Sequence, residues 1–76
     1  RNRMSELKDV AIELLDQYGD IVDIYYTQFL EVAFFLKVPA SYGLALGFLK
    51  RKLPQLTEEQ LGFLISEITS AYHETE

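Results

Sequence analysis

The residue types that carry enzymatic or metal chemistry are scarce in this chain. It contains no cysteine and a single histidine, His73. A disulfide and a cysteine nucleophile are therefore excluded, and a zinc site would have to rely on one imidazole and carboxylates. None of the four serines stands in a spacing that suggests a histidine and an acid as catalytic partners. We therefore predict a protein that is not an enzyme, with no catalytic residue, no bound metal and no cofactor.

Two local patterns resemble ligand-binding loops without matching them. Asp16, Asp20 and Asp23 surround Gly19, but a calcium-binding loop has its glycine elsewhere, and side chains without suitable ligand oxygens stand where such a loop needs them. The two glycines at 43 and 47 have no preceding strand and no following Lys-Ser/Thr pair, so they do not form a phosphate-binding loop. We interpret Gly19 as a helix junction.

Acidic side chains recur along one face of the first predicted helix. At about 100° per residue they share one sector opposite the apolar stripe, and we call this set the acidic ridge: Glu6, Asp9, Glu13, Asp16 and Asp20. Like charges four residues apart destabilise an isolated helix by roughly 0.2–0.5 kcal/mol per pair. The ridge is either a solvated face that keeps the protein in solution or a docking surface for a basic partner protein.

Basic residues are few and concentrated in Lys50-Arg51-Lys52, and the net charge is −5. Because nucleic-acid affinity comes largely from cationic side chains, this balance disfavours DNA or RNA binding. At the C-terminal end of a helix the cluster favourably opposes the helix dipole. The alternative is a helix-turn-helix domain in which residues 39–53 form the recognition helix and the cluster contacts phosphate.

Aromatic side chains exceed what one face of a small core needs. Tyr25 and Tyr26 cannot both point inward from one helix, and Phe63 departs from the apolar stripe of its own helix. Exposed aromatic residues are enriched at protein interfaces. We therefore predict a partner-binding patch made by Tyr25, Tyr26, Phe34 and Phe63 together with the acidic ridge.

The elements that would position these residues are all helices. Apolar residues recur at steps of three and four, which predicts an all-α fold built as a compact four-helix bundle. Gly19 would end the first helix and Val38-Pro39 the second, while Thr57 and Gln60 match the capping box of the last. The predicted helices span residues 5–18, 21–37, 39–53 and 57–73, and residues 1–76 form one domain.

The second predicted helix, residues 21–37, is apolar on more than one face. Such a helix must either lie at the centre of the fold or contact a second chain, so we expect a homodimer. Gly43 and Gly47 are one turn apart, and small residues at that spacing allow close helix approach. They serve either packing within the fold or a dimer seam.

Location and function follow by elimination. The most apolar stretch, residues 29–49, contains Glu31, Lys37 and Pro39, which argues against a membrane span. No signal-peptide pattern follows the first residues, so we expect a cytoplasmic protein. The prediction is a small acidic helical protein that binds another protein as a regulator, inhibitor or assembly factor. The alternatives are the helix-turn-helix domain and an oligomerisation domain of a longer chain.

Overall fold

The computed structural model contains three α-helices, α1 (Arg3–Leu36), α2 (Tyr42–Lys52) and α3 (Glu58–Glu74). It describes the backbone of residues 3–74 and the side chains of residues 8–70. The all-α class is confirmed. The predicted four-helix bundle is wrong, because the first two predicted helices are one continuous helix of 34 residues.

Gly19 lies inside α1 and does not end it. No glycine of the described backbone has a positive φ, so Gly19 lacks the left-handed conformation of a helix cap. The apolar stripe continues in phase through this point, from Leu15 and Tyr18 to Val22 and Phe29. A glycine inside a helix costs about 1 kcal/mol relative to alanine, which packing on both sides of Gly19 can offset.

The C-terminal end of α1 is closed by a Schellman motif. The amide of Val38 donates to the carbonyl of Ala33 at 3.0 Å, and that of Lys37 donates to the carbonyl of Phe34 at 3.2 Å. This closure requires a left-handed residue, and Lys37 has a φ of 59°. The chain then reverses through residues 38–41 toward α2.

The second prediction to be corrected is the start of the helix expected at Pro39. α2 begins at Tyr42, because Ser41 is its N-cap: the Ser41 hydroxyl accepts a hydrogen bond from the amide of Leu44 at 3.3 Å. Pro39 therefore belongs to the connection. α3 begins at Glu58 with the predicted capping box. The Thr57 amide donates to Gln60 Oε1 at 2.9 Å, and the Gln60 amide donates to Thr57 Oγ1 at 3.1 Å.

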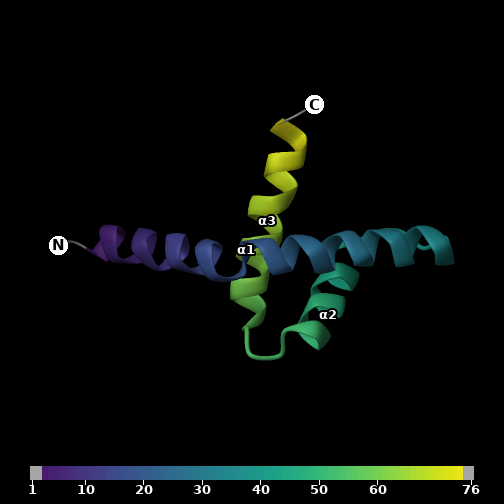
Figure 1. Ribbon diagram of the computed structural model, residues 1–76, viewed down its shortest axis with the longest axis horizontal. Coiled ribbons are helices and arrows are strands. Elements are labelled where there is room, and N and C mark those ends of the chain that lie inside the picture. Colours follow the sequence, from purple (N-terminus) through teal and green to yellow (C-terminus); the bar gives the residue numbers. More distant parts are fainter. Residues whose placement is uncertain (1–2, 75–76) are drawn as a thin grey trace.

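The three helices meet at one small core. α3 crosses α1 steeply near its middle, and α2 lies beside the C-terminal half of α1 (Figure 1). Every buried side chain among the described residues is apolar: Val22, Phe29, Ala33, Ala45, Leu49, Leu53, Leu56, Leu61, Leu64 and Ile65. The molecule measures 48 × 31 × 18 Å. A helix of 34 residues is about 51 Å long, so α1 accounts for the longest dimension and its ends project beyond the core.

Candidate protein-binding surface

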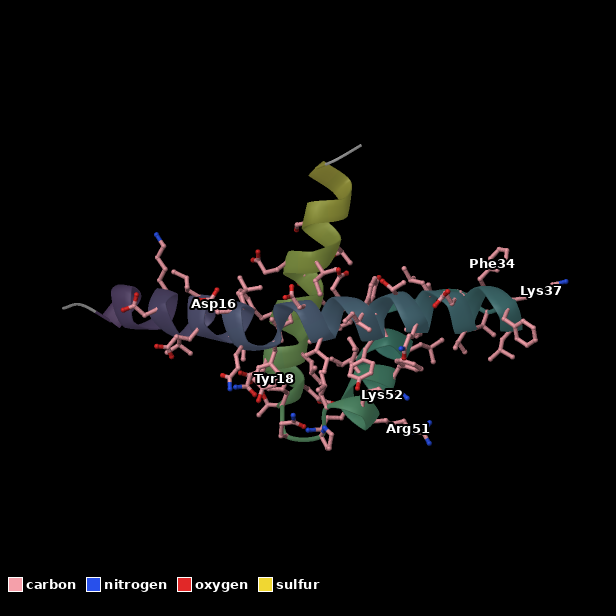
Figure 2. All side chains as sticks on the ribbon, in the orientation of Figure 1. Asp16, Tyr18, Phe34, Lys37, Arg51 and Lys52 are labelled. Carbon is pink, nitrogen blue, oxygen red and sulfur yellow. The ribbon has the colours of Figure 1, made fainter. Side chains whose placement is uncertain are left out.

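Of the large apolar side chains that the structure describes, the two most exposed lie at the C-terminal end of α1. Phe34 is 86% exposed and Phe35 is 82% exposed, although both are large aromatic residues. We call this surface the apolar tip, and its members are Phe34, Phe35, Leu36, Val38 and Leu44. Figure 2 shows Phe34 and Lys37 at the projecting end of α1, away from α3.

The tip results from the sequence of the last turns of α1. Residues 32–36 are Val-Ala-Phe-Phe-Leu, which places apolar side chains on every side of the helix. Only one side can face the core: Ala33 is 3% exposed, whereas the side chains that follow it point away from the core. The Schellman closure at Lys37 fixes this turn and returns Val38 to the same surface.

A groove of about 370 Å³ joins the tip to α2. Apolar side chains from both helices line it, and Arg51 is the one charged residue among them; the others are Phe29, Val32, Ala33, Leu36, Val38, Leu44, Gly47 and Phe48. A second hollow is lined by Ala33, Phe34, Phe35 and Val38 together with the charged residues Glu31 and Lys37. The tip therefore carries an apolar groove with charged residues at its edge, a form that suits an inserted side chain or helix.

The acidic ridge lies toward the opposite end of α1. Glu13, Asp16 and Asp20 are exposed and Asp9 is half-buried, while the side chain of Glu6 lies outside the described residues. Figure 2 labels Asp16 in the N-terminal half of α1 and Phe34 at its C-terminal end. Eighteen residues separate them, which is about 27 Å along a helix.

The structure does not gather the predicted aromatic patch in one place. Tyr25, Tyr26 and Phe63 are half-buried and pack against the core. The rings of Tyr26 and Phe29 lie 6.0 Å apart between centroids. Phe34 lies apart, on the tip. Sequence reasoning missed the rest of the tip, although the uninterrupted apolar run around Phe34 could have indicated it.

Two members of the basic cluster interact with their own chain. Lys50 Nζ donates hydrogen bonds to the carbonyl oxygen of Leu56 at 2.6 Å and to that of Pro54 at 3.2 Å. These bonds give the two carbonyl groups of the turn after α2 a hydrogen-bond donor. Lys52 Nζ lies 5.5 Å from the ring centroid of Phe48 and 5.9 Å from that of Tyr25. Arg51 remains exposed and reaches the groove (Figure 2).

No helix of the same chain packs closely against Gly43 or Gly47 among the described residues, although their spacing allows it. A Cβ placed on Gly43 or Gly47 would meet no atom within 4 Å beyond its own stretch of helix, among the residues that the structure describes. Packing within the fold therefore does not require either glycine, and the dimer seam stays a prediction. Sequence reasoning missed Gly62, where a Cβ would collide with the hydroxyl of Tyr42 from α2.

The metal-ligating residue types within residues 8–70 do not cluster. No group of three or more histidine and acidic residues lies together there in a way that could hold a metal ion. The sole histidine, His73, lies beyond the described side chains. Over the same part of the chain, no helix has both the length and the apolar character needed to cross a membrane. The chemistry that this surface supports is apolar contact.

The chain was compared with protein-family models, with curated proteins and with solved structures, and none of these comparisons finds a match.

Proposed function

We propose that the protein is a non-enzymatic interaction module that binds a partner protein through the apolar tip. The observation that carries this proposal is the exposure of Phe34 and Phe35, at 86% and 82%. With about 200 Å² for an aromatic side chain and somewhat less for an aliphatic one, the five residues of the tip expose roughly 600 Å². Contiguous apolar patches on monomers are about 300–600 Å² at most and are themselves often functional.

The groove beside the tip adds shape to this surface. A partner helix can place an apolar side chain between α1 and α2, against Leu36 and Leu44, where Gly47 leaves room for its backbone. Aromatic anchors in such pockets usually dominate binding energy. Phe34 and Phe35 are the anchors that this protein contributes.

The acidic ridge favours a partner that also carries basic side chains. A standard interface covers about 800 Å² on each partner, which is roughly 30 Å across. Asp16 lies about 27 Å from Phe34 along α1, so a single partner can contact both the ridge and the tip. Attraction between such oppositely charged surfaces mainly raises the association rate, and added salt weakens that attraction. The protein would then act as a regulator, inhibitor or assembly factor by covering a partner's surface, and we propose a cytoplasmic location for it.

The helix-turn-helix alternative stays a prediction that the observed contacts do not favour. Lys50 and Lys52 already serve the α2–α3 turn and two aromatic rings. Phosphate binding would have to compete with those interactions. An electrophoretic mobility shift at physiological salt tests it, since the proposed interaction module forms no complex with DNA.

The proposal is tested with a photo-crosslinking amino acid in place of Phe34, in the cells that produce the protein. The control carries it in place of Ser66, which is exposed on α3 and belongs to neither the tip nor the ridge. The expected result is a crosslinked partner at position 34 that is absent at position 66. Equal products at both positions would contradict a tip-specific partner.

The partner is then purified and its affinity is measured by calorimetry. Removing an aromatic anchor lowers the binding free energy by about 2 kcal/mol or more, which raises Kd roughly 30-fold. Phe34→Ser is expected to weaken binding by at least that factor, while Ser66→Ala leaves it unchanged. Unchanged binding by the Phe34 variant would refute the proposal.

A further inference from the structure

A second apolar line runs along α1 beside the face that packs on the core, and one of its members, Leu14, is half-buried and also packs against the core. Its positions follow one another at alternating steps of four and three residues. We call it the α1 seam, and its members are Val10, Leu14, Gln17, Ile21, Ile24, Gln28, Glu31 and Phe35. Four of them are exposed apolar side chains: Val10 at 60%, Ile21 at 38%, Ile24 at 57% and Phe35 at 82%.

The spacing of the seam is that of a coiled coil. Alternating steps of four and three average 3.5 residues, the repeat that keeps one line of side chains facing a partner helix. At 100° per residue the seam lies roughly 130° around α1 from the line of Val22, Phe29 and Ala33 that enters the core. It covers residues 10–35, which is about three and a half heptads, and sustained patterns of three to four heptads indicate helix pairing.

The area fits one side of a stable dimer. The four exposed apolar side chains present roughly 400 Å², taking 150–200 Å² for each whole side chain. A standard interface buries about 800 Å² on each partner, of which about 57% is apolar, or roughly 450 Å². The seam therefore supplies about the apolar area that one partner contributes, before its two glutamines are counted.

The polar positions of the seam favour an identical helix as its occupant. Gln17 and Gln28 are exposed and lie on the seam between its apolar members. A glutamine amide both donates and accepts hydrogen bonds, so it can pair with the same residue type on a second copy. A polar residue at a coiled-coil core position fixes register in this way. The seam carries no lysine or arginine, and its one charged member, Glu31, lies near its end.

We infer that two copies of this chain pair through the α1 seam, helix against helix. This surface differs from the seam predicted at Gly43 and Gly47, which are on α2. The inference does not rest on the proposed function. Phe35 belongs to both the seam and the apolar tip, so in the dimer the second copy covers it and Phe34 remains as the aromatic anchor for a partner protein. Phe34 lies about 100° around α1 from Phe35 and is outside the seam.

The test is the mass of the purified chain over a range of concentrations, by analytical ultracentrifugation. The wild type is expected to be a dimer, with twice the 8.8 kDa of one chain. Ile24→Glu places a charge at the centre of the seam and is expected to weaken dimerisation at least 100-fold. Because Ile24 is 57% exposed, its variant should keep its helical circular dichroism as a monomer.

Ile12→Glu is the matched control. It removes the same residue type at a similar exposure of 50% and adds the same charge, but it lies roughly 120° away from Ile24 around α1. It is expected to remain dimeric. A wild type that stays monomeric at near-millimolar concentration would overturn the inference, and so would equal effects of the two variants.

Cysteine crosslinking supplies a second readout that does not depend on a disruptive charge. The chain has no cysteine of its own, so each introduced thiol reports one position. A parallel pair crosslinks Ile24→Cys to itself, and an antiparallel pair crosslinks Ile24→Cys to Ile21→Cys; either result supports the seam. A dimer that forms neither crosslink would contradict it. A dimer lost on Phe34→Ser but not on Ile24→Glu would place the contact at the tip instead.

Discussion

Replacing Gly47 by alanine should stabilise the folded chain. Gly47 lies inside α2, which has 11 residues, and a Cβ there would meet nothing within 4 Å among the described residues outside its own stretch of helix. Alanine is favoured over glycine in a helix interior by about 1 kcal/mol. Nothing in the fold opposes that gain. Gly43 has equally open surroundings but lies in the first turn, so we expect a smaller effect there.

The expected magnitude is large enough to measure. For a domain of 60–100 residues, 1 kcal/mol corresponds to a change in Tm of about 4–8 °C. Gly62→Ala is the control, because it offers the same propensity gain but its Cβ would collide with the hydroxyl of Tyr42. Its gain should be smaller, or its effect should be destabilising. Urea and thermal unfolding followed by circular dichroism measure both variants.

The concentration of the protein separates the two interpretations of Gly47. In dilute solution, where the chain is a monomer, Gly47→Ala must raise the free energy of unfolding if the structural argument is correct. A loss of stability in dilute solution would refute it. A gain in dilute solution that becomes a loss at high concentration would instead show that a second helix approaches α2 closely at this glycine, as a dimer seam there requires.

Two further variants test the ends of the helices. Lys37→Gly should raise the free energy of unfolding by about 1 kcal/mol, because Lys37 has a φ of 59° that glycine adopts without strain; a lower Tm on thermal unfolding would contradict the Schellman closure. Thr57→Ala should lower the free energy of unfolding by about 1 kcal/mol, since it removes the oxygen that accepts the Gln60 amide. Thr57→Ser, which keeps that oxygen, should behave nearly as the wild type in urea unfolding.

Local signals in the sequence predicted local structure well. The capping box at Thr57 and Gln60 depends on neighbouring residues alone, and it is present. The helical class follows from periodicity in the same way. The start of α2 was predicted wrongly because two N-terminal signals, Pro39 and Ser41, lie two residues apart. Ser41 begins the helix, and only its side chain can accept the hydrogen bond from the amide of Leu44.

The continuity of α1 depends on information that single residues do not carry. Gly19 followed by Asp20 resembles a helix end followed by an N-cap, but the phase of the apolar stripe across Gly19 indicates one helix. Whether packing outweighs the cost of the glycine depends on contacts with α3, which come from residues far along the chain. The same applies to the tip. Sequence indicates a surplus of apolar surface on residues 21–37, but only the position of α2 and α3 decides that Phe34 is left exposed.

The central claim is that Phe34 belongs to a surface and not to the core. The free energy of unfolding of Phe34→Ser, measured in dilute solution beside that of Phe29→Ser, tests it most directly. Serine and phenylalanine have similar helix propensities, so the comparison reports burial. Because Phe34 is 86% exposed and Phe29 is 5% exposed, Phe34→Ser should change stability by less than about 0.5 kcal/mol. Phe29→Ser should cost about 3–5 kcal/mol or unfold the chain. A loss of about 2 kcal/mol or more from Phe34→Ser would show that the fold itself covers this side chain, and it would contradict the account.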